Sequence, residues 1–462
     1  MKKLIFLLAS ILLLILISCN NTSNRQTDQK QTKTDRKMGK TIPEWTKDKV
    51  IYEINVRQYS KEGKFEAVKK DLPRLKELGV GILWFMPIYP IGELNRKGSL
   101  GSYYSIQNYT AINPEFGTIE DFKEIVEEAH KLGMYVIIDW VANHTAWDHV
   151  WTKSHPDFYT RDSLGNIVSP VEDWSDVADL NYDNPNMRQA MIDDMKFWLN
   201  EANIDGFRCD VAMMVPTEFW NEARKQLDEI KPVFMLAEAE QQDLHEAAFD
   251  ACYSWELMHA INAVAKGEKP CNEIDSILSW ENKKFSPDVY HLRFTTNHDE
   301  NSWNGTVYER LGDGAKAFSV LCYTIPGVPL IYSGQEAAMK KRLAFFDKDE
   351  IEWGHYKFQE FYTKLNQLKK ENPALWSGLY GGEFFKLPSN NNSDKIYAYA
   401  RTKEANKIIV VLNLSDKLLN VEISLPEVLK DNYKDLFQDN MIELSDKISV
   451  ELGAWEFKVF VK

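Results

Sequence analysis

The stretch DGFRCDVA, residues 205–212, places an arginine and an aspartate two positions apart in what otherwise has the composition of a short buried strand. Side chains alternate along a strand, so Arg208 and Asp210 point to the same side. Two buried opposite charges are costly unless they pair. An isolated pair of this kind indicates a structural ion pair, whereas further polar groups at matching positions would indicate a site for chemistry.

The bulk composition is that of a globular protein with one large domain and a smaller one. The 462 residues exceed the size of one ordinary compact domain. A hydrophobic fraction of 44% is far from that of a disordered chain. The net charge of −14, with no evident basic patch, argues against nucleic acid as a partner.

The N-terminus predicts a lipid-anchored, exported protein. Lys2 and Lys3 precede a short apolar run, which is typical of a secretory signal peptide over residues 1–18 rather than a membrane span. LISC (16–19) resembles the bacterial lipoprotein processing box, which implies cleavage before Cys19 and lipid attachment to its thiol. The expected location is the bacterial cell envelope, at the outer membrane or a periplasmic face; the alternative is an uncleaved anchor. Residues 19–41 are polar and predict a flexible tether.

From residue 50 onward, strand-like and helix-like segments alternate about eight times. Helical periodicity covers 65–78, where Pro73 predicts a kink or a late start and Gly79 the end, and continues at 117–133 and 183–202. Near-continuous apolar strands such as 80–89 are typical of parallel sheets covered on both faces. The pattern predicts an α/β fold, a (β/α)8 barrel built from 42–144 and 181–375. The expected strands are 50–59, 80–89, 134–144, 206–212, 233–239, 251–257, 290–301 and 327–336.

Two stretches break this alternation. Residues 145–180 are irregular and rich in Asp and Trp, which predicts a short inserted domain or long loop after the third strand. From 376 to 462 the periodicity changes to short alternating segments, which predicts a C-terminal antiparallel β-sandwich.

Polar side chains occur at the ends of four of the expected strands. In a barrel of this kind the active site lies at the carboxyl ends of the strands, so these groups are expected to share one pocket. Paired carboxyl groups in such a pocket suit cleavage or transfer at a glycosidic bond, in which one attacks the anomeric carbon and the other protonates the leaving oxygen. The groups are Asp139, Asn143 and His144; Arg208 and Asp210; Glu238; and Asn297, His298 and Asp299.

Four segments in this order resemble the signature segments of the α-amylase superfamily of glycoside hydrolases. They are DWVANH (139–144), GFRCD (206–210), the glutamate of LAEA (236–239) and TTNHD (295–299). GVGILWFMPIYP, ADLN and GVPLIYSGQE resemble three further family segments. The resemblance covers roughly residues 45–375, and the tail is similar to the family's C-terminal β domain.

The resemblance implies roles for individual residues. Asp210 would be the nucleophile, Glu238 the general acid/base and Asp299 the stabiliser of the transition state. Arg208 would lie beside Asp210 and favour its ionised form by lowering its pKa. Among the substrate-binding residues, His144 and His298 would hydrogen-bond the sugar next to the cleaved bond, and Tyr104 would stack on it. Asp139 is expected to position the loop after the third strand.

The sequence also departs from the family pattern. Many amylases carry Lys and His three and four residues after the nucleophile, on the leaving-group side, where this chain has Met213 and Met214. Asn143 and Asp179 match calcium ligands of many amylases, and oxygen ligands suit Ca²⁺. The alternative is that both residues tie the inserted segment to the barrel.

The resemblance implies a retaining α-glucan hydrolase that cleaves α-1,4-glucosidic bonds in starch-like polysaccharides or maltooligosaccharides. One alternative is a 4-α-glucanotransferase, which would pass the glycosyl unit to another sugar, or an α-1,6-acting relative. Another is a non-catalytic glycan-binding protein on the same scaffold, although such proteins typically lose one or more of the carboxylates.

Overall fold

The computed structural model describes residues 40–462. The predicted signal peptide, the lipidation site Cys19 and the tether up to residue 39 lie outside this range. Lys40, the penultimate residue of the predicted tether, is buried and donates to the backbone carbonyl of His245 at 2.7 Å. The folded domain therefore already includes the last two residues of that segment.

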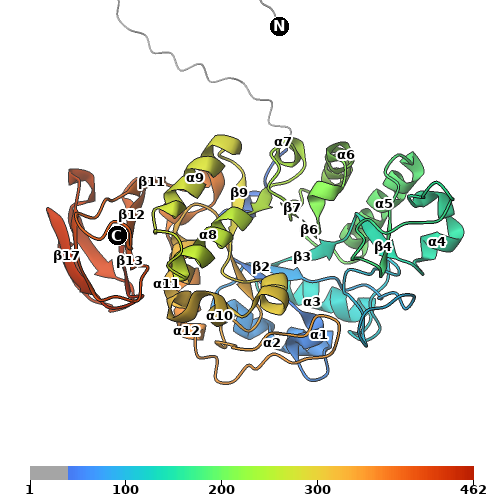
Figure 1. Ribbon diagram of the computed structural model, residues 1–462, viewed down its shortest axis with the longest axis horizontal. Helices are drawn as coiled ribbons and strands as arrows, with labels where there is room; N and C mark the ends of the chain where they lie inside the picture. Colours follow the sequence, from blue (N-terminus) through green and yellow to red (C-terminus); the bar gives the residue numbers. More distant parts are fainter. Residues whose placement is uncertain (1–39) are drawn as a thin grey trace, which may run out of the picture. The chain divides into compact units, whose positions relative to one another are not determined.

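Eight parallel strands close into a barrel in the order β1-β10-β9-β8-β7-β6-β3-β2 (Figure 1), which confirms the predicted (β/α)8 architecture. Each strand is short and almost wholly buried, as expected for a sheet covered by helices outside and filled by side chains inside. The strands are β1 (Ile51–Ile54), β2 (Ile82–Phe85), β3 (Tyr135–Trp140), β6 (Gly206–Cys209), β7 (Phe234–Ala237), β8 (Ala251–Tyr253), β9 (Tyr290–Arg293) and β10 (Val328–Tyr332).

The helices of the outer layer follow the predicted signals at their ends. Thr118 and Asp121 form a capping box, and Asn184 caps the helix that starts with Pro185. The helix that contains Pro73 starts at Phe65 and runs through the proline, so the predicted late start is wrong. The helices are α1 (Val56–Tyr59), α2 (Phe65–Leu78), α3 (Ile119–Lys131), α5 (Pro185–Glu201), α6 (Thr217–Asp228), α7 (Leu244–Ala247), α8 (Trp255–Ala265), α9 (Glu273–Lys284), α10 (Val307–Leu311), α11 (Ala315–Thr324) and α12 (Gln359–Glu371).

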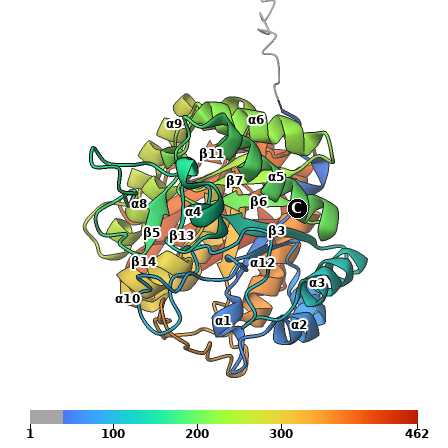
Figure 2. The ribbon, with the colours of Figure 1, turned by 90° about the vertical axis from the view of Figure 1, so that its right-hand side faces the viewer.

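The segment after β3 leaves the barrel and returns to it through a small antiparallel ladder. β4 (His144–Ala146) pairs with β5 (Val177–Asp179), and the short helix α4 (Val150–Ser154) lies between them in the chain. Figure 2 shows this segment on the face turned toward the viewer, with the C-terminal strands behind it. The ladder fixes both ends of the inserted segment beside the carboxyl end of β3.

The C-terminal region is antiparallel throughout. A six-stranded sheet, in the order β11-β12-β13-β18-β15-β16, and the β14–β17 pair share one hydrophobic core. Inward-facing residues such as Ile409 and Ile423 come from different sheets, as in a sandwich. The strands are β11 (Glu383–Lys386), β12 (Ile396–Lys403), β13 (Asn406–Asn413), β14 (Leu419–Ser424), β15 (Asp431–Asp435), β16 (Met441–Leu444), β17 (Lys447–Leu452) and β18 (Phe457–Val461).

The start of the described chain lies across the amino-terminal ends of the barrel strands. The Trp45 ring stacks on Tyr135, at the start of β3, with 3.8 Å between centroids. Thr46 Oγ1 donates to the hydroxyl of Tyr290, at the start of β9, at 3.3 Å. Residues 40–46 thus lie on the barrel face opposite the carboxyl ends of the strands. Within residues 40–462, no helix has the length and apolar character needed to cross a membrane.

Candidate active site

The predicted catalytic and sugar-binding residues meet at the carboxyl ends of the barrel strands. Arg208 lies in β6 and is completely buried. In the register of β6 and β7, Cys209 pairs with Ala237. The next residue on each strand is therefore Asp210 and Glu238, respectively, so two carboxylates leave neighbouring strands at the same level. This register brings together two residues that are 28 positions apart in the sequence.

The guanidinium of Arg208 contacts three carboxylates. Nη1 donates to Asp139 Oδ1 at 2.9 Å and to Asp210 Oδ1 at 3.0 Å. Nη2 lies 3.0 Å from Glu238 Oε2, as an ion pair that lacks the alignment of a hydrogen bond. The sequence-based expectation that Arg208 and Asp210 pair is confirmed, and the same cation also lies against Glu238. One positive charge thus holds two acids close together at the mouth of the barrel.

A strained residue fixes the position of Glu238. Val211, directly after Asp210, has φ 36° and ψ 46°, in the left-handed region that β-branched residues rarely adopt. Its backbone N–H donates to Glu238 Oε2 at 2.8 Å. Such strain persists only where the surroundings enforce it and is concentrated at functional sites. The turn after β6 therefore orients the carboxylate that follows β7.

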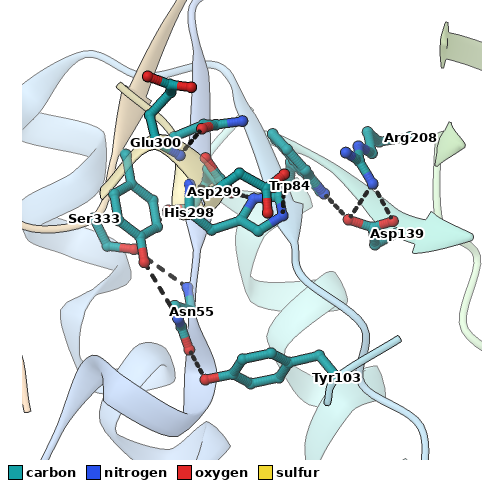
Figure 3. A network of polar contacts seen from close by, with 12 residues as sticks. Asn55, Trp84, Tyr103, Asp139, Arg208, His298, Asp299, Glu300 and Ser333 are labelled. Atoms are coloured by element: carbon teal, nitrogen blue, oxygen red, sulfur yellow. Dashed lines mark hydrogen bonds and ion pairs between the residues drawn. The ribbon is translucent and has the colours of Figure 1, made fainter. Parts of the chain in front are cut away.

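A second group of contacts centres on His298 (Figure 3). Its Nδ1 lies 2.5 Å from Glu53 Oε1, and its Nε2 lies 2.7 Å from the Tyr104 hydroxyl and 3.3 Å from Asp299 Oδ2. The rings of Tyr104 and His298 are stacked, with centroids 5.5 Å apart. Asp299 differs from the other two predicted catalytic acids because its side chain is 34% exposed. It faces the opening, where a bound molecule could reach it.

Asp139 joins the two groups of contacts. Besides Arg208, it accepts hydrogen bonds from the Trp84 indole at 3.1 Å and from the Tyr104 hydroxyl at 3.3 Å. Figure 3 shows Trp84 and Arg208 converging on it. The expectation that Asp139 positions the loop after β3 is therefore incomplete, because its carboxylate holds the cation of β6 and the tyrosine of the β2–α3 loop.

Burial and neighbouring charges shift the pKa values in the site. Burial, together with the negative charge of Glu238, raises the pKa of Asp210 well above its ordinary value, and Arg208 opposes this rise. Arg208 does lower the pKa of Asp210, as expected, but burial and the charge of Glu238 raise this pKa by more. Burial would lower the pKa of His298, but the charges of Asp299 and Glu53 raise it to about 9. At neutral pH, His298 therefore carries both ring protons.

Glu53 is the site residue that the sequence reasoning missed. It lies in β1, is fully buried, and balances the charge of His298. The available signal was a single charged residue inside the apolar strand segment VIYEI. The sequence did not show which residue pairs with Glu53, because His298 is 245 positions away in the chain.

The family model described as "Alpha amylase, catalytic domain" matches residues 20–166 and 171–413. The chain belongs to this family. It is a glycoside hydrolase of the α-amylase type, and the "Maltogenic Amylase, C-terminal domain" model matches residues 385–459.

Relatives cover most of the chain. A solved maltogenic α-amylase, AmyB of Thermotoga neapolitana, is 31% identical over 90% of this chain and 99% of its own, with a TM-score of 0.83. A solved α-amylase of Lactobacillus plantarum is 30% identical with the same two coverages and a TM-score of 0.81. The α-amylase MalA of Haloarcula japonica is 28% identical over 81% of this chain, which spans 56% of that protein's length.

His144 and the two predicted calcium ligands, Asn143 and Asp179, lie at or next to the β4–β5 ladder. His144 pairs with Asp179, and the backbone N–H of Leu180 donates to the Asn143 carbonyl at 3.3 Å. Burial lowers the pKa of His144 to about 3, so this imidazole is neutral. The β4–β5 ladder ties the inserted segment to the barrel, which is the role that the alternative to calcium binding gives to Asn143 and Asp179.

The same residues fall short of a complete calcium site. Ca²⁺ takes about six to eight oxygen ligands, and Asn143 and Asp179 supply one amide and one carboxylate. Within residues 40–462, no cluster of three or more His, Cys, Asp or Glu side chains could hold a metal ion. Calcium at Asn143 and Asp179 stays a prediction, in which backbone carbonyl and water oxygens would have to supply the remaining ligands.

Two exposed methionines occupy the positions where many family members carry Lys and His. Met213 and Met214 are 44% and 39% exposed, at the end of the strained turn that contacts Glu238. They line an open groove of about 420 Å³ together with apolar residues (Val215, Pro216 and Leu244) and polar ones (Thr217, Gln241 and Asp243). A sugar placed there would meet the thioethers of the two methionines beside the polar side chains of Thr217, Gln241 and Asp243.

Proposed function

We propose that this enzyme is a retaining α-glucan hydrolase that cleaves α-1,4-glucosidic bonds in starch-like polysaccharides or maltooligosaccharides. The observation that carries the proposal is the contact of one buried guanidinium, Arg208, with both Asp210 and Glu238. Retaining glycosidases place their two carboxyl groups about 5–5.5 Å apart, closer than inverting enzymes, which need room for a water molecule. Two acids that share one guanidinium suit the retaining arrangement.

In the proposed mechanism Asp210 acts as the nucleophile, and Glu238 acts first as the acid and then as the base. The ionised carboxylate of Asp210 attacks the anomeric carbon and forms an ester bond, while the glycosidic C–O bond breaks and the protonated Glu238 gives its proton to the leaving oxygen. Water then attacks the same carbon, Glu238 takes the proton of that water, and the bond to Asp210 breaks. Both inversions at carbon cancel, so the product keeps the α configuration. The partly exposed Asp299 stabilises the positive charge that develops on the sugar ring.

The contact with Arg208 supports this division at Asp210, because a guanidinium favours the ionised carboxylate, whereas burial and Glu238 oppose ionisation. Asp210 accepts an aligned hydrogen bond from Arg208 and must be ionised to attack. Its raised pKa means that activity is expected to disappear on the acidic side at a higher pH than an ordinary aspartate would impose. Tyr104, His144 and His298 surround the expected position of the sugar, and their sugar contacts remain part of the proposal.

Product analysis tests the proposal. The chain without residues 1–18, with Cys19 replaced, is incubated with maltoheptaose, pullulan, cyclodextrin and isomaltotriose, and the sugars are separated over time. Short α-configured maltooligosaccharides from maltoheptaose are expected. Asp210→Asn should lower turnover by more than about 100-fold, whereas Asp162→Asn, in the inserted segment, should leave it unchanged. A smaller loss for Asp210→Asn would contradict the nucleophile assignment.

The second candidate is a 4-α-glucanotransferase, which the exposed Met213 and Met214 favour. Two methionines make the acceptor side more apolar, and they would contact the apolar face of a second sugar. A hydroxyl group of this sugar, rather than water, would then attack the glycosyl-enzyme. The discriminating result is the appearance of products longer than the substrate when maltotriose is the only sugar supplied.

We also propose that the enzyme is a lipoprotein of the bacterial cell envelope, anchored through Cys19. The apolar run and the LISC segment support this proposal. Metabolic labelling with a palmitate analogue tests this, since labelling is expected in the full chain and should be lost in Cys19→Ala.

A further inference from the structure

Trp303 is an exposed tryptophan directly beside the proposed catalytic residues. Its side chain is 51% exposed, and it lies in a π-helical turn, η4 (Glu300–Asn304), that begins immediately after Asp299. Single exposed apolar side chains are common and need no explanation by themselves. Short π-helical turns, however, are rare and frequently occur at functional sites. Whether Trp303 has a role in substrate binding therefore depends on the residues around it.

The loop after β10 holds this turn in place. Ser302 Oγ donates to the Leu343 carbonyl at 2.8 Å, and Leu343 N–H donates to Asn301 Oδ1 at 2.8 Å. Asn301 Nδ2 also donates to the Lys341 carbonyl at 3.1 Å. These bonds join two loops that follow neighbouring barrel strands, so the backbone that carries Trp303 is fixed relative to Asp299.

Aromatic rings continue from the proposed sugar site to Trp303. The Phe345 ring lies nearly parallel to Tyr104, at 13° and 6.2 Å between centroids, and 6.4 Å from His298. Trp303 follows at 5.1 Å from Phe345 and 5.6 Å from Phe346. The indole is the outermost ring of this series, and the phenylalanines support it from behind. A sugar chain that leaves the Tyr104 position along this wall would meet the indole next.

The barrel order shows which end of the substrate the indole faces. In the ring of eight strands, β10 and β6 are four positions apart and lie across the mouth from each other. The loop after β6 carries Met213 and contacts Glu238, which protonates the leaving group in the proposed mechanism. Phe345, in the loop after β10, therefore lies opposite the Met213 loop, and Trp303, in the loop after β9, packs against Phe345 at 5.1 Å between centroids. The part of the chain that stays on Asp210 must extend toward this side.

We propose that Trp303, supported by Phe345 and Phe346, binds the apolar face of the second glucosyl ring on the retained side of the cleaved bond. A flat indole offers a large contact area at low entropic cost, and a glucopyranose ring presents C–H groups on its faces. This residue would set the requirement for at least two glucosyl units before the cleaved bond. The inference rests on the proposed function, because it assumes that Asp210 keeps the sugar.

Two chromogenic substrates test this directly. 4-Nitrophenyl α-maltoside places two glucosyl units on the retained side and 4-nitrophenyl α-glucoside places one, while the leaving group is the same. Trp303→Ala should lower kcat/KM for the maltoside by about 10-fold, a typical effect of truncating a binding tryptophan. For the glucoside the change should stay within about twofold of wild type, and Trp303→Phe should retain most of the maltoside activity.

Leu418→Ala, which truncates an exposed apolar side chain in the C-terminal region, is the matched control and should change neither value. An equal loss on both substrates would show a structural role of Trp303 and overturn the proposal, as would an unchanged maltoside value. If the wild type releases nitrophenol from neither substrate, the proposed function is at fault. In that case calorimetry measures the binding of maltotriose. Binding about 10-fold weaker in Trp303→Ala than in the wild type supports the proposed role of Trp303. Equal binding overturns it.

Discussion

His298 Nδ1 lies 2.5 Å from Glu53 Oε1, and neither side chain is accessible to solvent. The pair joins β1 to the loop after β9 at the floor of the proposed site. Because Glu53 holds one ring proton of His298, the other is directed at the Tyr104 hydroxyl and at Asp299. Glu53 thus orients an imidazole at the proposed sugar site and, together with Asp299, maintains its positive charge.

Replacing Glu53 by Gln is expected to lower the pKa of His298 from about 9, since a neutral amide no longer favours the charged ring and burial opposes it. ¹⁵N NMR of labelled histidine over pH 5–10 measures this directly. Glu115→Gln, on an exposed loop, is the control and should leave the titration unchanged. An unchanged titration in Glu53→Gln would show that Asp299 alone maintains the charge.

The same pair predicts a pH dependence of stability. The folded-state pKa of His298 is raised above 6.5, so the stabilisation is complete below about pH 6.5 and is lost as the pH rises through about 9. The free energy of unfolding should fall by about 3 kcal/mol across this window. Urea denaturation at several pH values measures it, and a slope as steep in Glu53→Gln as in the wild type would refute the assignment.

Arg208→Lys keeps a positive charge but removes the planar fork that contacts Asp139, Asp210 and Glu238 together. We expect kcat/KM to fall by about 100-fold, because an ammonium cannot hold both catalytic acids in place. The acidic limb of the pH–rate profile should move to higher pH as Asp210 loses its partner. Arg161→Lys, in the inserted segment, is the matched control. Near-normal turnover by Arg208→Lys would mean that charge alone is sufficient.

Met213→Lys combined with Met214→His restores the residue types that many family members have on the leaving-group side. The ratio of hydrolysis to transfer should rise, because a polar acceptor side favours water over the apolar face of a second sugar. Chromatography of maltotriose products over time measures the ratio. Met441→Lys, at an exposed methionine of the C-terminal region, tests for a nonspecific effect of charge. An unaltered ratio would exclude the methionines as the determinant.

Removal of calcium tests the remaining alternative at Asn143 and Asp179. Because the β4–β5 ladder already ties the inserted segment to the barrel, chelation with EGTA should leave Tm within about 2 °C. A larger fall, restored by added Ca²⁺ and absent in Asp179→Asn, would establish the ion as a ligand of this protein. Differential scanning calorimetry with and without chelator gives the answer.

The architecture and most of the site could be predicted from the order of the amino acids. Apolar runs and helical periodicity are local properties, so the barrel and its capped helices could be predicted, with an error at Pro73 because the helix accommodates the proline. The site followed from one rule, that the carboxyl ends of parallel strands meet, which placed Asp210, Glu238 and Asp299 together.

Which side chains contact one another in the site could be seen only in the folded protein. Glu53 and His298 are 245 residues apart, and Asp139 receives Arg208, Trp84 and Tyr104 from three other segments. The series of rings that ends at Trp303 also joins separate loops. Such contacts depend on loop paths and on strand register around the closed barrel, and no local pattern encodes them. For the same reason the sequence could not show that burial and a second acid outweigh Arg208 in setting the pKa of Asp210.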